Sequence, residues 1–297
     1  MHKLISLILF SFLLTMLTGC SQTPVTESRG QQMGNLLLAE PVPVSPRSQM
    51  AIIRYNQILA SADLSDEERA ELTYQRGMLY DSVGLGGLAQ FDYSQALQLK
   101  PDMAEAYNSM GIHFIQQGEY IQAYEAFDST LDINPDYDFA FLNRGIALYY
   151  GDRSDLAIPD LRTFYNNDPS DPFRALWLYF AMAAVNEVDA QAYLADIRSN
   201  ISQNHWALSL VDLYLGNVGE DHLLGQLIDG VSNQRELTER LCEAYFYLGK
   251  YHSSQQNQGI AANYFKLALS TNVYDYVEHR YARKELKRLR QPDSDNP

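Results

Sequence analysis

The chain contains one pattern three times, in YQRGMLYDSVGLGGLAQFDYSQALQLKP (residues 74–101), NSMGIHFIQQGEYIQAYEAFDSTLDINP (108–135) and LNRGIALYYGDRSDLAIPDLRTFYNNDP (142–169). Each stretch has a glycine, then an apolar residue three positions later, an alanine at twelve, an apolar residue at sixteen and a proline at twenty-four. In order, these are Gly77, Tyr80, Ala89, Tyr93 and Pro101; Gly111, Phe114, Ala123, Phe127 and Pro135; and Gly145, Leu148, Ala157, Leu161 and Pro169. Five positions stay in phase with a period of 34 residues, which indicates a structural repeat rather than accidental periodicity in an ordinary helical bundle.

The spacing within each unit predicts two helices joined by a turn. Small residues such as Gly77 and Ala89 let the two helices approach closely, and the ring of Tyr93 fills the space beside them. Pro101 ends the second helix because proline cannot continue one. A single unit cannot bury its apolar face alone, so neighbouring units stack into a solenoid. The period and the pattern resemble the tetratricopeptide repeat. We therefore predict an all-α tetratricopeptide-repeat (helix–turn–helix) solenoid with extra flanking helices, and repeats over residues 70–184.

The pattern decays after Pro169 and then returns. A helix is predicted from Pro172 to Ala184, but Tyr179 stands at the glycine position and Gln191 at the alanine position, so this last repeat is degenerate. Linking helices are predicted within residues 185–241, at 202–215 and 220–228. A C-terminal repeat and helix are predicted over residues 242–290, because the template recurs in Tyr245, Leu248, Gly249, Ala261, Phe265 and Ala268.

The first 46 residues predict export and anchoring. Residues 1–19 read as a lipoprotein signal peptide, because a short basic start precedes an apolar run that is too short to span a bilayer comfortably. The sequence Leu17-Thr18-Gly19-Cys20 resembles a bacterial lipobox, which implies that the Cys20 thiol receives the lipid. Ser21 in the next position resembles lipoproteins sorted to the outer membrane. The alternative is a plain secretory signal with an incidental cysteine. Residues 20–46 are predicted to be the lipid anchor and an extended tether, since they are rich in proline and polar residues.

Helices are also predicted on both sides of the repeats. An N-terminal flanking helix within residues 47–69 either caps the solenoid or packs on another copy of the protein, and Ser65 and Glu68 form a capping box before the first repeat helix. The final helix, residues 277–289, and its end carry Arg280, Arg283, Lys284, Lys287, Arg288 and Arg290. Cations at a helix C-terminus complement the helix dipole, which is the favoured interpretation, and a docking site for an acidic partner is the alternative. Residues 291–297 are predicted to form a disordered tail.

Residues suited to catalysis or metal binding do not form a recognisable motif. The six histidines lack metal-site spacing, and neither a nucleophile elbow nor a phosphate-binding glycine loop is evident. His252 is predicted to be a core histidine, and Cys242 a buried small hydrophobe. The formal net charge of −15 argues against nucleic acid or an anionic membrane surface as the main partner. We predict a protein that is not an enzyme and has no cofactor and no metal.

A repeat of this kind binds partners in a groove lined by the first helix of each unit. The predicted protein-binding groove consists of Tyr74, Met78, Asn108, Ile112, Asn143, Tyr149, Trp177 and Phe180. None of these side chains is basic, so a clamp for an acidic C-terminal tail is disfavoured. The polar-to-aromatic gradation favours an apolar peptide segment or another protein's helix. The alternative is that Leu176, Trp177 and Phe180 are covered by later helices of the same chain.

Beyond the repeat, the chain resembles the NlpI family of outer-membrane lipoproteins. The resemblance rests on LYDS (79–82), AYEAFDS (123–129), LNRGIALYYG (142–151) and VEHRYA (277–282), and covers nearly the whole mature chain. It is weakest in the tether, in residues 189–204 and in the tail. It implies a homodimeric, lipid-anchored adaptor at the outer membrane that faces the periplasm. Proteins of that family bind murein hydrolases and present a cell-wall endopeptidase to a tail-specific periplasmic protease.

Two other functions stay open on the sequence alone. One is an outer-membrane assembly lipoprotein, of the pilotin or barrel-assembly type, that escorts membrane proteins. The other is an enzyme that uses an unrecognised site.

Overall fold

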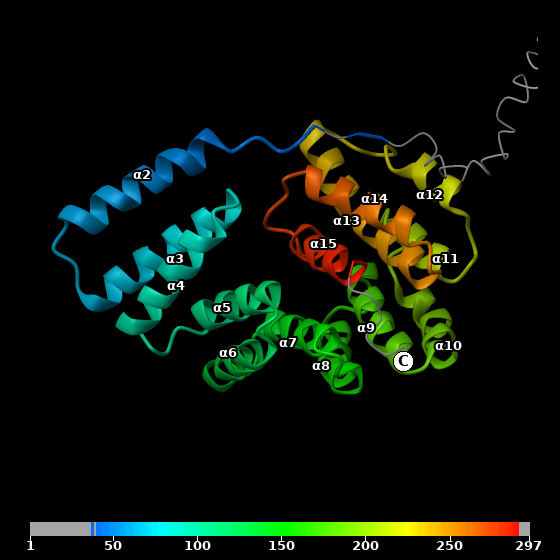
Figure 1. Ribbon diagram of the computed structural model, residues 1–297, viewed down its shortest axis with the longest axis horizontal. Coiled ribbons are helices and arrows are strands. Elements are labelled where there is room, and N and C mark those ends of the chain that lie inside the picture. The colour runs from blue at the N-terminus through cyan, green and yellow to red at the C-terminus, as the bar shows by residue number, and fades with distance from the viewer. Residues whose placement is uncertain (1–36, 39, 291–297) are drawn as a thin grey trace, which may run out of the picture. The chain divides into compact units, whose positions relative to one another are not determined.

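The computed structural model describes residues 37–38 and 40–290, and every regular element in that part of the chain is helical (Figure 1). The helices are α2 (Pro46–Ser61), α3 (Asp66–Ser82), α4 (Gly86–Leu99), α5 (Ala104–Gln117), α6 (Tyr120–Ile133), α7 (Asp138–Tyr150), α8 (Ser154–Asn167), α9 (Pro172–Val185), α10 (Glu187–Ile197), the 3₁₀ turn η2 (Arg198–Asn200), α11 (Leu208–Tyr214), α12 (Glu220–Gln226), α13 (Gln234–Ser254), α14 (Gln258–Ser270) and α15 (Val277–Arg288). No helix among these residues combines the length and the apolar character needed to span a membrane. Cys20, the predicted signal peptide and the predicted tail lie outside the described residues.

Consecutive helices pair as hairpins, α3 with α4, α5 with α6, α7 with α8, α9 with α10 and α13 with α14. The recurring glycines make room at the crossing of each regular hairpin. A Cβ atom on Gly111 would lie 2.5 Å from Cε1 of Phe127, which is closer than real Cβ atoms come to a neighbour. The same holds for Gly77 against Tyr93 (2.7 Å), Gly145 against Leu161 (2.6 Å) and Gly249 against Phe265 (2.6 Å). The predicted all-α tetratricopeptide-repeat solenoid is therefore confirmed, down to the residues that set the contact between paired helices.

Helix ends follow the predicted signals. Helices α4, α6 and α8 end at Leu99, Ile133 and Asn167, each two residues before a template proline. The predicted capping box opens α3, where the Glu68 amide donates to Ser65 Oγ (3.2 Å) and the Ser65 amide donates to Glu68 Oε2 (2.9 Å). A cap of this kind contributes about 1 kcal/mol to helix stability.

In two of the hairpins, an arginine of the first helix also pairs with an aspartate of the second helix, at the same template positions. In the first, Nε of Arg76 donates to Asp92 Oδ2 at 2.7 Å. In the third, Nε of Arg144 donates to Asp160 Oδ2, also at 2.7 Å. Arg144 follows Arg76 by 68 residues, twice the repeat period, and Asp160 follows Asp92 by the same interval. These ion pairs were not predicted from the sequence, although the recurrence of both residues at twice the repeat period indicated them.

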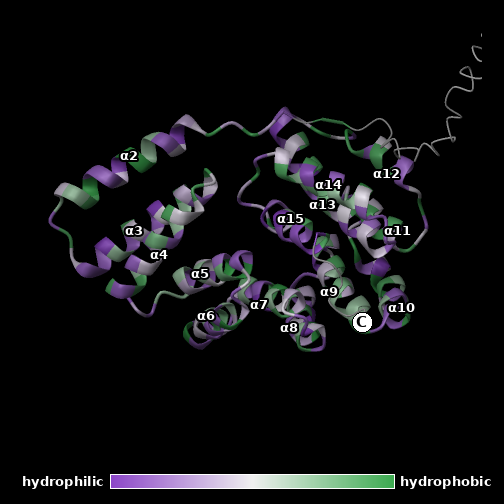
Figure 2. Cartoon of the chain, in the orientation of Figure 1, coloured by the Kyte–Doolittle hydropathy of each residue, from purple (hydrophilic) through white to green (hydrophobic). Residues whose placement is uncertain are grey.

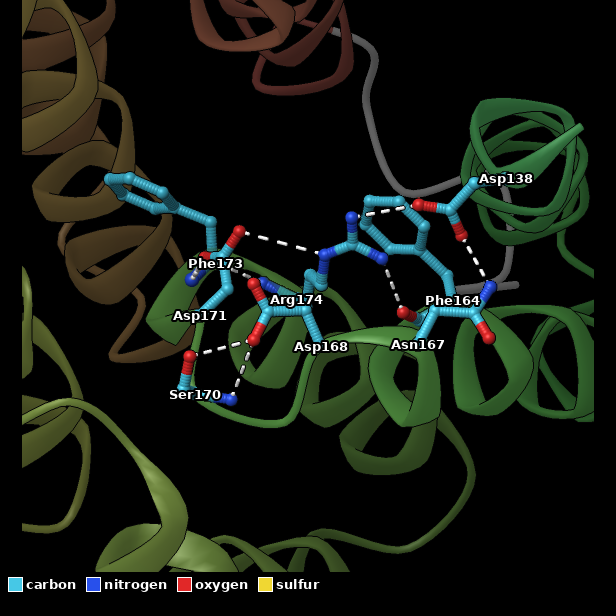
Figure 3. Close-up of polar contacts among 8 residues, drawn as sticks. All are labelled: Asp138, Phe164, Asn167, Asp168, Ser170, Asp171, Phe173 and Arg174. Atoms are coloured by element: carbon cyan, nitrogen blue, oxygen red, sulfur yellow. Dashed lines mark hydrogen bonds and ion pairs between the residues drawn. The ribbon is translucent and has the colours of Figure 1, made fainter.

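Arg174 connects three successive helices at the start of α9 (Figure 3). Its guanidinium forms an ion pair with Asp138 of α7 (Nη2 to Oδ2, 2.7 Å) and donates through Nη1 to the main-chain oxygen of Phe164 in α8 (2.6 Å). The guanidinium carbon lies 3.8 Å from the centre of the Phe164 ring. Asp171 caps the same helix by accepting from the Phe173 amide at 2.7 Å. The fourth hairpin is therefore fixed to the third even though its own template positions are altered.

Three predicted boundaries differ from the structure. The helix predicted at 202–215 begins at Leu208, because His205 Nδ1 accepts from the Ala207 amide (3.1 Å) in a turn just before it. Helix α12 ends at Gln226, short of the predicted 228. Helix α13 begins at Gln234, where Asn233 caps it by accepting from the Glu236 amide (3.0 Å), so the predicted boundary at 242 falls inside this helix.

Part of the predicted tether packs on the folded body. The Thr238 hydroxyl of α13 donates to the main-chain oxygen of Glu40 (3.2 Å), and the Val42 amide donates to the main-chain oxygen of Thr271 (2.8 Å). The Tyr245 hydroxyl donates to the main-chain oxygen of Leu37. Within the predicted extended tether, residues 37–38 and 40–42 are non-helical, and main-chain groups of Leu37, Glu40 and Val42 find partners on the C-terminal repeat.

Candidate protein-binding surface

The first helices α3, α5, α7 and α9 form the surface that we call the first-helix face, where the sequence predicted a groove. Three of the predicted groove residues, Tyr74, Asn108 and Asn143, are buried between helices. Asn143 Nδ2 donates to Asn108 Oδ1 at 3.0 Å, so these amides join α5 to α7 instead of facing a partner. Met78 is 38% exposed, while Ile112 and Tyr149 are half-buried. The accessible part of the predicted groove is therefore smaller than the sequence suggested.

Trp177 and Phe180 are not available on this face. Trp177 is only 2% exposed, and its ring lies 6.0 Å from Phe246 of α13 and 6.3 Å from Tyr281 of α15 (ring centres). Phe180 is buried as well, against Tyr247 of α13. The assignment of Trp177 and Phe180 to an open groove is corrected accordingly, and the alternative of coverage by later helices is the arrangement observed.

Helix α15 covers the first-helix face by direct contact with three repeats. Its Lys284 Nζ donates to the main-chain oxygen of Ile115 in α5 at 3.1 Å. Its Tyr281 ring lies 5.4 Å from that of Tyr150 in α7, in addition to the contact with Trp177 in α9. Figure 2 shows α15 as largely hydrophilic and α9 as hydrophobic along most of its length. Only the cations of α15 entered the sequence prediction, whereas the spacing of Tyr281, Ala282, Glu285 and Leu286, all buried, was the signal for docking.

A buried ion pair holds α15 to α13. Lys250 Nζ lies 2.7 Å from Glu285 Oε1 and donates to the Tyr149 hydroxyl at 2.6 Å. The Tyr150 hydroxyl donates to the same carboxylate oxygen at 2.9 Å. Burial acts to lower the pKa of Lys250, but the Glu285 carboxylate and Tyr149 together outweigh it, and the pKa lies above its usual value. Burial acts to raise the pKa of Glu285, but Lys250 and Arg288 outweigh it and that pKa is lowered. Both groups are therefore charged at neutral pH.

A cavity of about 390 Å³ opens beside this ion pair. Its aromatic lining comes from Tyr149, Tyr179, Phe180 and Tyr214. Its other walls carry polar and charged side chains, which are Glu187, Lys250, Ser253, Ser254, Gln258, Glu285 and Arg288. We call it the Tyr149 cavity. Tyr149 and Phe180 are the two predicted groove residues that line it, and of these Tyr149 is half-buried whereas Phe180 is buried. Tyr214 and Lys250 were missing from the prediction, because they come from α11 and from the C-terminal repeat helix α13, which lie outside the predicted groove of residues 74–180.

A second, smaller cavity of about 170 Å³ lies on the other side of α15. One wall consists of basic residues of α15, namely Arg280, Arg283, Lys284 and Lys287, and the facing wall includes Asp81 and His113. We call it the basic cleft. It shares no lining residue with the Tyr149 cavity.

The two side chains that could be reactive, Cys242 and His252, have structural roles. Cys242 is fully buried, and burial raises the pKa of its thiol well above the usual range, so the reactive thiolate is disfavoured. His252 Nε2 lies 2.8 Å from Glu220 Oε2, and its ring stacks on that of Tyr264. Both residues match their predicted core roles. Among the described residues, no three histidine, cysteine or carboxylate side chains are grouped so as to hold a metal ion.

No family model matches the chain. Among solved structures it is similar to MamA (TM-score 0.46, 20% identity, 52% of this chain and 82% of MamA covered). It is also similar to YrrB, whose structure is described as a TPR protein with an unusual peptide-binding site (TM-score 0.39, 17% identity, 82% and 100% covered). A third similar structure is a tetratricopeptide repeat protein from Parabacteroides merdae (TM-score 0.47, 16% identity, 83% and 100% covered). At these identities the comparisons concern the fold alone.

Proposed function

We propose that this protein is a non-catalytic adaptor that binds segments of other proteins in the Tyr149 cavity. The observation that carries the proposal is an aromatic-lined cavity at the edge of a helical-repeat surface, held in shape by the buried Lys250–Glu285 pair. Aromatic side chains supply most of the energy of protein interfaces, and polar rims supply specificity. A partner segment with one apolar side chain flanked by hydrogen-bonding groups fits that lining.

The cellular setting of the proposal comes from the sequence. The lipobox at Cys20 supports a lipid anchor in the outer membrane, with the folded part facing the periplasm. The resemblance to the NlpI family supports a homodimer that scaffolds murein hydrolases and presents a cell-wall endopeptidase to a tail-specific periplasmic protease. The net charge of −15 supports protein rather than nucleic acid as the partner.

A reconstituted degradation assay tests the adaptor function. A purified cell-wall endopeptidase is incubated with a purified tail-specific periplasmic protease, with and without this protein, and its loss is followed over time. We expect this protein to accelerate degradation at least about tenfold, because tethering two partners raises their effective concentration. The protein alone should leave the endopeptidase intact.

A matched pair of variants connects the assay to the cavity. Ala184→Trp places a large ring in the wall of the Tyr149 cavity, whereas Ala195→Trp adds the same ring to an exposed position of α10 that lines neither cavity. We expect the first variant to lose the acceleration and the second to keep it, with unchanged circular dichroism in both. No acceleration by the wild-type protein would reject the adaptor function. In a pull-down from solubilised envelopes, capture of β-barrel proteins in place of the hydrolase and protease would favour an assembly lipoprotein.

A further inference from the structure

Helix α15 has two chemically different faces. Arg280, Arg283, Lys284 and Lys287 follow the i, i+3, i+4, i+7 spacing, so they lie along one side of the helix and line the basic cleft. The helix dipole favours cations only in the last turn, whereas Arg280 and Arg283 lie in the first two turns. Dipole compensation therefore leaves half of this basic face unexplained.

The wall opposite the basic face is nearly neutral. It is formed by the end of α3 and the start of α4, with Asp81, Gly84 and Gly86, and by His113 and Gln116 of α5. Asp81 is the acidic member of the lining, and its carboxylate is already engaged. It accepts from the Tyr93 hydroxyl at 2.9 Å and lies 3.0 Å from His113 Nε2.

Among the described residues, none of the four cations forms an ion pair with a carboxylate, although Asp275 acts on Arg280 electrostatically. Arg280 Nε donates to the main-chain oxygen of Tyr274 (3.1 Å), and Lys284 Nζ donates to that of Ile115, so both use neutral acceptors. Within the part of the chain that the structure describes, Arg283 and Lys287 form no ion pair, and both are exposed. The cleft thus has an excess of positive charge on a chain whose formal net charge is −15.

The titration of Lys284 reflects the same excess. Burial, followed by the nearby cations Arg288 and Lys287, lowers the pKa of this ammonium group to about 8. Glu285 and Asp152 act in the opposite direction without restoring the usual value. An anion placed in the cleft would offset the repulsion among these cations.

We propose that the basic cleft binds an acidic segment of a partner protein, with carboxylates paired to Arg283 and Lys287. Arginine binds carboxylates through two parallel hydrogen bonds, and a cleft of this size takes one or two side chains of a peptide. A nucleic acid or an anionic membrane would bring many negative charges against the overall negative field of the protein, whereas a short acidic peptide acts within about one Debye length, about 8 Å. The cleft is a second binding surface, separate from the Tyr149 cavity, and supplies the cations that the predicted groove positions lack.

Fluorescence anisotropy with a defined probe tests this assignment. The probe is a fluorescein-labelled twelve-residue peptide with six glutamates, and its partner probe has glutamine at the same six positions. At low salt we expect the full-length protein to bind the glutamate peptide at least about tenfold more tightly than the glutamine peptide, with an affinity that falls as salt rises.

Two charge-reversal variants separate the cleft from the general field. Arg283→Glu/Lys287→Glu reverses two cations of the basic cleft, and Arg54→Glu/Lys266→Glu makes the same net change at exposed positions of α2 and α14. We expect the first variant to lose at least about thirtyfold in affinity for the glutamate peptide and the second to stay within about threefold. Both should keep the circular dichroism of the wild-type protein, because the substituted side chains are exposed.

Three results would overturn the proposal. One is the absence of binding by the wild-type protein at about 1 mM glutamate peptide, which corresponds to an interaction weaker than about 4 kcal/mol. A second is an equal loss in both variants, which would mean attraction by overall charge. The third is full binding by Arg283→Glu/Lys287→Glu. The reconstituted degradation assay can still succeed in each case, so failure of this inference is distinguishable from failure of the adaptor function.

Discussion

The second and fourth hairpins fill the space between their two helices in different ways, one with an apolar ring and the other with a hydrogen-bonded tyrosine. Between α5 and α6, Gly111 leaves space that the ring of Phe127 fills. Between α9 and α10, Tyr179 stands where the template has glycine, and its hydroxyl donates to Glu187 Oε1 (2.7 Å) and accepts from Gln191 Nε2 (3.0 Å). A small residue is therefore needed where the partner helix supplies a large apolar side chain. Where the partner helix supplies polar groups, a hydrogen-bonded tyrosine can take the same position.

The two hairpins also differ in what covers them. Helix α5 keeps exposed or half-buried residues along one side, whereas α9 is buried from Ala175 through Ala181 because α13 and α15 pack against it. The regular repeats leave part of the first-helix face accessible, and the degenerate repeat is absorbed into the core. Loss of the template in the sequence thus coincides with a change from surface to interior.

Breaking the attachment of α15 should have the largest effect on stability. Glu285→Ala leaves Lys250 buried without a counter-charge, which should lower the free energy of unfolding by about 3–5 kcal/mol. The double variant Lys250→Met/Glu285→Leu should lose much less, because it removes both charges. Glu239→Ala, which breaks the exposed pair with Arg235, should cost about 0.5 kcal/mol or less. Urea unfolding measures all three, and a cost for Glu285→Ala as small as that for Glu239→Ala would contradict this account of the pair.

Filling the space beside the glycine of a regular hairpin should cause the next largest loss of stability. Gly111→Leu should lower the free energy of unfolding by roughly 2–5 kcal/mol, because its side chain must displace the Phe127 ring. Gly87→Leu is the matched control, since a Cβ there meets no neighbour within 4 Å. Thermal unfolding followed by circular dichroism compares the two. Similar losses in both variants would mean that glycine at 111 has no special packing role.

Restoring the template in the degenerate hairpin should destabilise it. Tyr179→Gly gives α9 the glycine of the other repeats, yet it removes a buried ring and two hydrogen bonds, so we expect a loss of about 2–4 kcal/mol. Tyr179→Phe should lose less, because only the hydroxyl is removed. A gain in unfolding free energy for Tyr179→Gly would show that the template glycine is favoured there after all.

Acid should weaken the C-terminal helix by a smaller amount. Burial lowers the pKa of His279 to about 4, against about 6.5 in an unfolded chain. Between those pH values the unfolded chain binds a proton that the folded chain does not, so stability falls as the pH falls from about 6.5 to about 4. Over this pH range, the unfolding free energy of His279→Gln should fall by about 1–2 kcal/mol less than that of the wild-type protein. Unfolding curves at pH 7 and pH 4.5 for both proteins give the difference, and parallel losses would contradict a role for His279.

Local chemistry explains what the sequence predicted well. The glycine and ring pairs, the template prolines and the Ser65 capping box each act within one hairpin, so their consequences can be derived from spacing alone. Helix α15 was predicted with nearly its observed bounds for the same reason. Docking of α15 on α5, α7 and α9 depends on contacts between residues that are more than 100 positions apart in the sequence, such as Tyr150 and Glu285. Spacing within one helix cannot report such a contact, which is why the sequence left open whether Trp177 lines the groove or is covered by later helices.

Photo-crosslinking beside the Tyr149 cavity tests most directly whether the partner binds there. A photoreactive p-benzoylphenylalanine is introduced at Val185, an exposed residue next to the cavity residue Ala184, or at Ala195 as the control, and each full-length protein is irradiated with the purified cell-wall endopeptidase. We predict a covalent adduct from position 185 and none from position 195, because only position 185 adjoins the cavity without filling it. An adduct from position 195 alone, or from neither position while degradation is still accelerated, would place the partner elsewhere and contradict the account.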